Sequence, residues 1–217
     1  MIMEGRPVAE RIKGSVRKQI KELGFKPCLA TLLVGEDPAS RVYLKAKEKV
    51  CEEVKVKSIT KTLPANTTKG EVIRVIESLN KDPNVHGILV QFPLPSHLDQ
   101  KEIVEFIYPA KDVEGLHPMN MGRLVTGRGE VAPCTASAVM ELLNYYDIDL
   151  KGKDVTVVGH SMVVGKPLAL LLLKEWATVS VCHIETRDLA EHTKNADIVI
   201  VAVGKPCLIK EDMVKEG

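Results

Sequence analysis

Tyr43 and Lys47 are a pair of residues whose types and spacing could support catalysis. They stand four positions apart in the segment Ser40-Arg-Val-Tyr-Leu-Lys-Ala-Lys47, so a helix would place both on one face, with Ser40 one turn earlier. A lysine amine can act as a general base once its surroundings lower its pKa. Lys45 and Lys49 flank Lys47, and spacing alone does not separate a catalytic lysine from lysines on a solvated face.

A turn bounded by Gly159 and Gly165 could bind a phosphate. It follows the apolar run 155–158 and precedes an apolar helical stretch, which is the context that a dinucleotide-binding fingerprint requires. Ser161 stands where the usual fingerprint has its second glycine, so the local pattern fits an ordinary strand-to-helix turn equally well. The Ser161 hydroxyl could donate to a phosphate, and the helix that follows would offer free N–H groups to an anion.

The end of the next predicted strand should contact the adenosine ribose of such a nucleotide. A carboxylate there favours the 2′-hydroxyl of NAD, whereas an arginine favours the 2′-phosphate of NADP. Glu185 and Arg187 both occur at this place, so the residues leave the choice between NAD and NADP open. Taken singly, these two are also typical of a solvated helix start, and His160 and His183 are typical of ordinary turn and strand-end positions.

The elements that would position these residues alternate between strand and helix patterns. The predicted strands are 28–34, 56–62, 86–91, 155–158, 178–182 and 198–203, and the predicted helices are 12–23, 40–54, 68–79, 137–146, 164–176 and 188–194. This rhythm implies crossover connections and mainly parallel sheets covered by helices. Residues 110–135 contain many Gly, Pro and polar residues and are predicted to be loop-like, which places the domain boundary between a first domain, 1–136, and a second, 137–217.

The composition excludes several classes of protein. A chain of 217 residues with 45% hydrophobic and 27% charged residues is typical of a globular protein of one large or two modest domains. A formal charge of +1 does not suit a dedicated nucleic-acid binder, so a small-molecule ligand is expected. Five scattered cysteines without a C-x-x-C pair indicate neither a disulfide framework nor a zinc site. With no signal peptide or membrane span in the sequence, we expect a cytoplasmic protein with no membrane association.

Six motifs occur together and in order along the chain. They are Tyr43-x-x-x-Lys47, Gly87-Ile-Leu-Val-Gln-Phe-Pro-Leu-Pro95, Lys111-Asp-Val-Glu-Gly115, Asn120-Met-Gly-Arg-Leu124, Pro133-Cys-Thr135 and Gly159-x-Ser-x-x-x-Gly165-x-Pro167. Over essentially the whole chain, the set closely resembles the bifunctional methylenetetrahydrofolate dehydrogenase/methenyltetrahydrofolate cyclohydrolase family. The resemblance implies an α/β protein with an N-terminal folate-binding α/β domain and a C-terminal Rossmann-like domain, with folate between them and a homodimer formed through the cofactor domain.

The resemblance also implies two reactions in one-carbon metabolism and purine biosynthesis. The first is NADP-dependent oxidation of 5,10-methylenetetrahydrofolate to the methenyl form, and the second is hydrolysis of that product to 10-formyltetrahydrofolate. Carried over by position, Lys47 is the catalytic lysine, Tyr43 packs along the folate and Gln91 is the amide partner of the lysine. The expected substrate-side residues are Tyr43, Pro93, Asp112 and Glu114, and the expected cofactor-side residues are Thr135, Gly159, His160, Ser161, Gly165 and Arg187.

The chemistry of these reactions agrees with the assignments that the resemblance implies. Hydride loss creates a methenyl cation, which a protonated lysine would repel, so Lys47 should act as a neutral amine whose pKa is lowered by desolvation. Water then attacks the same carbon, and the neutral amine can accept its proton. A carboxylate should pair with adjacent N–H donors of the pterin ring. No metal is expected, because the substrate already carries its electrophilic charge.

The sequence departs from the family pattern at several positions. Glu114 replaces the usual aspartate and reaches about 1.5 Å further, and Ala136 follows Pro-Cys-Thr where a proline is usual. His160 stands where some members have an arginine for the 2′-phosphate, which leaves Arg187 as the candidate for that contact. The chain ends at Gly217, where the family continues into a further strand, loop and helix, so we expect the second domain to be truncated.

Other functions fit parts of this pattern. A monofunctional dehydrogenase of the same fold would lose the hydrolysis step, although the retained Lys47 and Gln91 argue against it. A non-catalytic folate- or nucleotide-binding remnant is compatible with a truncated second domain. An amino-acid or shikimate-type dehydrogenase would share the two-domain α/β organisation and would be inert toward folates.

Overall fold

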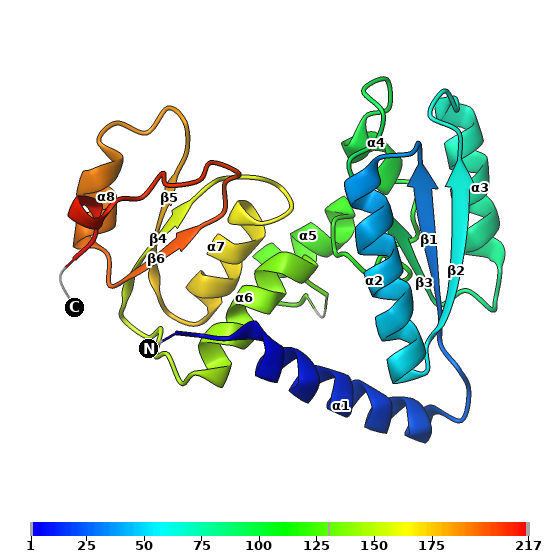
Figure 1. The fold of residues 1–217 in the computed structure, drawn as a ribbon, viewed down its shortest axis with the longest axis horizontal. Helices are drawn as coiled ribbons and strands as arrows, with labels where there is room; N and C mark the ends of the chain where they lie inside the picture. The colour runs from blue at the N-terminus through cyan, green and yellow to red at the C-terminus, as the bar shows by residue number, and fades with distance from the viewer. Residues whose placement is uncertain (1, 130, 216–217) are drawn as a thin grey trace. The chain divides into compact units, whose positions relative to one another are not determined.

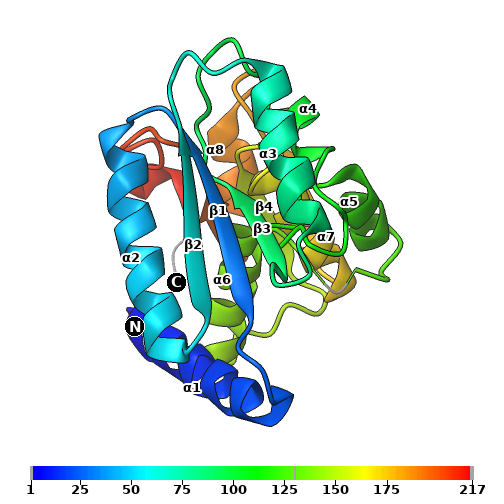
Figure 2. The same cartoon turned by 90° about the vertical axis from the view of Figure 1, so that its right-hand side faces the viewer.

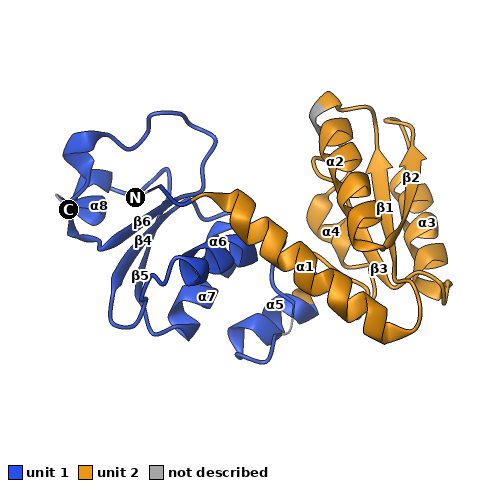
Figure 3. Ribbon diagram, turned by 60° about the horizontal axis from the view of Figure 1, so that its bottom comes forward, with its two compact units in different colours: residues 1–3, 119–217 blue, residues 4–118 orange. Residues whose placement is uncertain are grey.

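The protein folds as two compact units, each built around its own parallel sheet (Figure 1). A computed structural model describes residues 2–129 and 131–215. One unit comprises residues 4–118, and the other comprises residues 1–3 and 119–217 (Figure 3). The two-domain α/β organisation predicted from the sequence is confirmed.

The unit of residues 4–118 has three parallel strands in the order β2-β1-β3, formed by β1 (Cys28–Val34), β2 (Lys57–Leu63) and β3 (Gly87–Val90). Its helices are α1 (Gly5–Leu23), α2 (Pro38–Val54), α3 (Lys69–Lys81) and α4 (Gln100–Val104). The connection from β1 to β2 and the connection from β2 to β3 run across the sheet in opposite directions. Because such crossovers are right-handed, α2 and α3 lie on opposite faces of the sheet (Figure 2). The core includes Leu32, Ile76, Ile88 and Ile103, whose side chains are fully buried.

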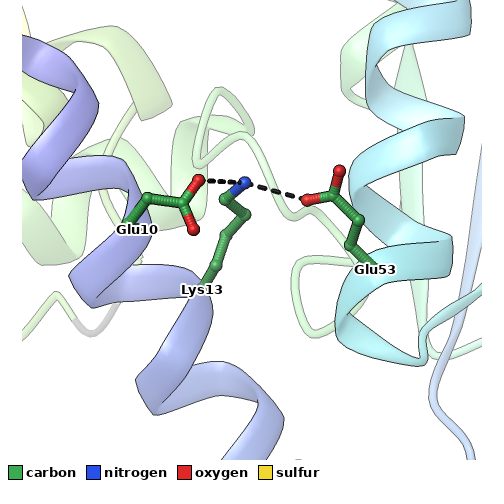
Figure 4. A network of polar contacts seen from close by, with 3 residues as sticks. All are labelled: Glu10, Lys13 and Glu53. Carbon is green, nitrogen blue, oxygen red and sulfur yellow. Dashed lines mark hydrogen bonds and ion pairs between the residues drawn. The ribbon is translucent and has the colours of Figure 1, made fainter.

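Helix α1 is joined to α2 by an ion-pair network (Figure 4). The Nζ atom of Lys13 lies 2.6 Å from Oε1 of Glu10 on the same helix and 2.8 Å from Oε2 of Glu53 on α2. These contacts raise the pKa of the Lys13 amine, chiefly through the hydrogen bond that the amine donates to Glu10. The network therefore connects α1 to the helix that carries Tyr43 and Lys47.

The other unit has strands in the order β5-β4-β6, formed by β4 (Asp154–Val158), β5 (Thr178–Cys182) and β6 (Ile198–Val201). Its helices are α5 (Pro118–Val125), α6 (Cys134–Tyr145), α7 (Gly165–Lys174) and α8 (Leu189–Asn195), followed by the 3-10 helix η1 (Glu211–Met213). The core is built by Val155 and Val157 of β4 against Leu168 and Leu172 of α7. Together β4, the following turn and α7 form the predicted strand-turn-helix unit.

Most of the predicted elements are confirmed, and one expectation is wrong. Strands 28–34 and 178–182 have the predicted bounds, and Thr68 and Glu71 form the predicted capping box at the start of α3. The expectation of a loop throughout residues 110–135 is wrong, because Pro118–Val125 forms α5 and α6 already begins at Cys134. In residues 2–129 and 131–215, no helix is long and apolar enough to cross a membrane.

Candidate functional site

The side chains of Lys47 and Gln91 contact each other at the carboxyl ends of the strands of the first sheet. Lys47 comes from α2 and Gln91 directly follows β3, and the Lys47 Nζ atom donates to Gln91 Oε1 over 3.3 Å. Lys47 is partly buried, whereas Lys45 and Lys49 of the same helix are exposed. Burial and a side-chain partner therefore separate Lys47 from its neighbours, which spacing did not do.

The carbonyl oxygen of Phe92 fixes the orientation of the Gln91 amide. Gln91 Nε2 donates to this oxygen over 3.0 Å, so Oε1 is the amide atom that faces Lys47. Ser40, which is buried in the first turn of α2, donates from Oγ to the same oxygen over 3.4 Å. The peptide bond between Phe92 and Pro93 is cis. The start of α2 and the segment after β3 thus hold Gln91 in a single orientation.

Residues 111–114 lie beside β3 and bring two acidic residues to the same region. Ile88 pairs with Asp112 in a parallel bridge, and the Ile88 N–H donates to the Lys111 carbonyl over 2.7 Å. A side chain at Gly87 would not fit, because a Cβ atom there would lie 2.4 Å from Cγ1 of Val113. The glycine that opens β3 therefore allows this segment to approach the strand.

Asp112 organises the loop that carries Glu114. Its side chain is 3% exposed, and its carboxylate accepts the backbone N–H groups of Glu114 over 3.1 Å and His117 over 2.8 Å. The neighbouring Lys111 donates from Nζ to three carbonyl oxygens at the end of α3, at 2.7 to 3.1 Å. Asp112, the first acid of the Lys-Asp-Val-Glu-Gly motif, thus accepts hydrogen bonds from the backbone of its own loop. Glu114, the second acid, is the candidate for contact with a ligand.

Glu114 is a partly buried carboxyl near Lys47. Burial raises its pKa because the ionised form loses solvation, the charge of Lys47 lowers it, and Asp112 raises it again. Tyr43 and Pro93, which were predicted to contact the substrate, are both exposed, Tyr43 by 69%. The unit of residues 4–118 therefore contains a lysine, an amide, a carboxyl and an exposed aromatic ring close to one sheet edge.

The turn after β4 has the close backbone packing that a dinucleotide-binding turn needs. Gly159 has φ +120°, and a Cβ atom at Gly165 would lie 1.9 Å from the carbonyl oxygen of Gly159. The second glycine of the usual fingerprint is replaced by Ser161, whose Oγ accepts the Val164 N–H over 3.1 Å at the start of α7. That hydroxyl keeps its own hydrogen for a phosphate oxygen, so this turn fits a nucleotide pyrophosphate.

A pocket of about 610 Å³ opens at the carboxyl ends of β4, β5 and β6. Its lining includes three of the predicted cofactor-side positions, Gly159, His160 and Ser161, together with His183. Glu185 and Arg187 are exposed and are not part of the lining, and Thr135 lies in the first turn of α6. His183 at the end of β5 thus lines the pocket, whereas Glu185 and Arg187 lie outside its lining.

Sequence reasoning missed Lys205, which also lines this pocket. It follows β6 in the segment Gly204-Lys205-Pro206. The available signal was a basic residue among helix- and strand-breaking residues, directly after a predicted strand of the parallel sheet. Such positions lie at the edge where ligands bind.

Comparisons with known proteins agree with both halves of the chain. The sequence profile described as "Tetrahydrofolate dehydrogenase/cyclohydrolase, catalytic domain" matches residues 3–114, and the profile described as "NAD(P)-binding domain" of the same enzymes matches residues 133–217. The bifunctional protein FolD of Nautilia profundicola is 52% identical over 219 residues, which cover 100% of this chain and 77% of that protein.

Solved structures show the same fold. The bifunctional FolD enzyme of Campylobacter jejuni is 46% identical, with a TM-score of 0.96, over 100% of this chain and 78% of that one. The Trypanosoma brucei enzyme, solved with NADP and an inhibitor, is 35% identical, with a TM-score of 0.95, over 100% of this chain and 76% of that one.

Proposed function

Because the chain belongs to the tetrahydrofolate dehydrogenase/cyclohydrolase family, we propose that it catalyses both reactions. It oxidises 5,10-methylenetetrahydrofolate with NADP and hydrolyses the methenyl product to 10-formyltetrahydrofolate. The observation that carries this proposal is the contact between Lys47 Nζ and the oriented Gln91 amide at 3.3 Å. A dehydrogenase alone would need the glycine turn but no lysine held in this way.

In the oxidation step, bound NADP supplies the acceptor for a hydride from the methylene carbon. The residues of the glycine turn would hold its pyrophosphate through the N–H groups at the start of α7 and the Ser161 hydroxyl. Lys47 is neutral in this step, so it does not repel the positive charge that develops on the substrate. Gln91 accepts a hydrogen bond from the amine and keeps it in place.

In the hydrolysis step, a water molecule attacks the methenyl carbon, and Lys47 Nζ accepts the proton that the water loses. The bond from this carbon to N5 of the pterin then breaks, N5 takes up a proton, and the formyl group stays on N10. The amine is a suitable base because Gln91 Oε1 receives one of its hydrogens and leaves its lone pair available.

Glu114 binds the pterin ring in this proposal. A planar carboxylate can accept two adjacent N–H donors, and such a contact would offset the loss of solvation that raises the pKa of Glu114. Asp112 holds the loop of Glu114 through two backbone N–H groups. Tyr43 and Pro93, which are exposed, provide apolar surface for the rest of the folate.

Three further features belong to the same proposal. The enzyme acts in one-carbon metabolism that supplies purine biosynthesis, works in the cytoplasm, and forms a homodimer through its second domain. The boundary between the folate-binding and NADP-binding domains lies between residues 136 and 137. The match of both halves of the chain to the family supports these features.

The proposal is tested with the purified protein and 5,10-methylenetetrahydrofolate. Formation of NADPH and of the methenyl compound should follow the addition of NADP, and added methenyltetrahydrofolate should be hydrolysed without nucleotide. NADPH formation without hydrolysis would support a monofunctional dehydrogenase. Tight folate or nucleotide binding with no turnover would support a non-catalytic binding protein, and either result would contradict the proposed pair of activities.

A further inference from the structure

A pocket of about 680 Å³ lies between β2 and α3 in the unit of residues 4–118 (Figure 1). Its lining comes from β2, from the loop of residues 64–67 and from α3, and its volume is in the range of small-molecule sites. Lys47 belongs to α2, which covers the opposite face of the same sheet (Figure 2). This pocket is therefore separate from the site around Lys47.

Five polar side chains line this pocket without partners of their own. They are Lys61, Asn66, Thr67, Arg74 and Ser78. Within residues 2–129 and 131–215, the structure gives none of these side chains a hydrogen bond or an ion pair. Thr67 is the most informative of them, because it is only 6% exposed and polar groups of residues this buried usually have a partner. Its hydroxyl group indicates that the pocket takes up a ligand with polar groups.

Glu71 adds one negative charge to the same lining. Its Oε2 atom accepts the Thr68 N–H and the Thr68 hydroxyl, each over 2.8 Å. These hydrogen bonds, chiefly the one from the backbone, lower the pKa of Glu71, so the carboxylate is ionised at neutral pH. No described residue donates to the other oxygen, Oε1. One oxygen of an ionised carboxylate is therefore available to a ligand that carries a donor.

The charges of the lining restrict the ligand. Lys61 and Arg74 are the cations and Glu71 is the anion, so the three together favour a ligand with one negative group and disfavour a polyanion. The planar guanidinium of Arg74 can donate two parallel N–H groups to a carboxylate. Glu71 stands three positions before Arg74 on α3, on the same stripe of the helix, where it can accept from an ammonium group of the same ligand.

The loop that closes the pocket is held in place by hydrogen bonds of its backbone. The Thr67 N–H donates to the Pro64 carbonyl over 3.1 Å, and the Thr67 carbonyl accepts from Nε2 of His97 over 2.9 Å. Leu63 and Val75 add apolar surface to the lining from β2 and α3. A site that is formed before the ligand arrives loses less entropy on binding.

We propose that this pocket binds a small amino carboxylate, a molecule with one carboxylate and one ammonium group beside an apolar part. Arg74 and Lys61 bind the carboxylate, Glu71 Oε1 accepts from the ammonium group, and Thr67 donates its hydroxyl hydrogen to the carboxylate. The apolar part lies against Leu63 and Val75. This inference does not depend on the proposed function, because it concerns residues on the other face of the sheet.

The test is a titration of the full chain, labelled with nitrogen-15, followed by two-dimensional NMR. The probes are L-phenylalanine, 3-phenylpropanoate, which lacks the ammonium group, and 2-phenylethylamine, which lacks the carboxylate. L-Phenylalanine should bind with a Kd of about 1 mM, as expected of about twelve non-hydrogen atoms, and should shift the amide signals of residues 61–67 and 71–79. Loss of the ammonium group should weaken binding by about tenfold, and loss of the carboxylate by more, because it contacts two cations.

Matched variants locate the carboxylate. Arg74→Gln and Lys61→Gln should each weaken L-phenylalanine by about tenfold at an unchanged Tm, because neither side chain holds another residue. The controls are Lys81→Gln on α3 and Lys57→Gln on β2, both exposed and outside the lining; they should bind like the wild type.

Several results would overturn the inference. They are the absence of shifts in residues 61–67 and 71–79, shifts confined to other parts of the chain, and equal binding of all three probes. Wild-type affinity in both Arg74→Gln and Lys61→Gln would also overturn it. Equal affinities of L-phenylalanine and 3-phenylpropanoate would remove Glu71 from its assigned contact.

Discussion

The two sheets have the same topology, but they build their sites in different ways. In each, the first strand is central, the second lies on one side and the third on the other, in the orders β2-β1-β3 and β5-β4-β6. In the first unit, hydrogen bonds position the side chains: Lys47 donates to Gln91, and Gln91 and Ser40 both donate to the Phe92 carbonyl. In the second unit, the turn depends on backbone surfaces that come close together at Gly159 and Gly165.

This difference predicts which substitutions affect chemistry and which affect folding. Removing a side chain near Lys47 should lower activity and leave the first sheet intact. The residues of β1 and β3 are packed in a hydrophobic core that does not depend on Lys47 or Gln91. Adding even one methyl group in the turn after β4 should disturb the second unit, because no space exists for it.

Gly165→Ala should have the largest effect on stability. Its Cβ atom would lie 1.9 Å from the Gly159 carbonyl oxygen, so the backbone must move, at a cost of about 3 kcal/mol or more. We expect a lower Tm of the second unit and loss of NADP binding. Gly122→Ala on α5 is the control, because nothing lies within 4 Å of that position. A Gly165→Ala variant with wild-type Tm and nucleotide binding would contradict this account of the turn.

Gln91→Leu should lower hydrolysis of methenyltetrahydrofolate by about 10-fold to 100-fold, the effect of losing one hydrogen bond to an amine. The variant Gln91→Glu keeps the shape and places a negative charge beside Lys47. That charge should raise the pKa of the lysine, so the rate should reach its plateau at a higher pH. A pH profile of Gln91→Glu identical to that of the wild type would show that Gln91 does not contact the working amine.

Glu114→Gln should raise stability and lower turnover. Burial raises the pKa of the Glu114 carboxyl in the folded protein, so the fold disfavours its ionised form. The stability of the wild type is therefore reduced as the pH rises from about 4.3, the value of an unfolded glutamate, through the raised pKa. The gain of the variant, about 1 kcal/mol, should appear near neutral pH and vanish in acid.

Thermal unfolding at several pH values checks the prediction for Glu114. The exposed residue Glu105 provides the control, as Glu105→Gln. A variant Glu114→Gln that is less stable than the wild type near neutral pH would mean that the ionised carboxyl is well solvated or paired in the fold.

Lys13→Met should have the smallest effect. Its ion pairs with Glu10 and Glu53 join α1 to α2 (Figure 4), but surface ion pairs contribute little to stability and are screened by salt. We expect a slight fall in Tm that becomes smaller in concentrated salt, with unchanged hydrolysis. A large loss of activity would indicate that α1 helps to place Lys47.

Much of the fold could be predicted from sequence because its strands are short apolar runs bounded by breakers. Helix α5 could not, because Pro118 and Gly122 within Pro118–Val125 weaken the helical pattern. Its buried Asn120 and Leu124 belong to tertiary packing, which periodicity does not describe. Local sequence thus predicts elements whose apolar pattern is long and misses those that neighbouring segments stabilise.

The site was predictable in part for a similar reason. The motifs indicated Lys47 and Gln91, but only the folded chain distinguishes Lys47 from Lys45 and Lys49 by burial. The turn of Asp112 toward two backbone N–H groups and the contact between His160 and His183 depend on loop conformations. Such contacts join residues whose spacing along the chain has no fixed relation to their distance in space.

The most direct test of the central claim compares Lys47→Gln with Lys45→Gln in the hydrolysis of methenyltetrahydrofolate. Lys47 is partly buried and bonded to Gln91, whereas Lys45 is exposed on the same helix. The account predicts that Lys47→Gln lowers the rate by about 100-fold to 10,000-fold, the range for loss of a general base, and that Lys45→Gln stays close to wild type. Equal rates for the two variants would contradict the role of Lys47.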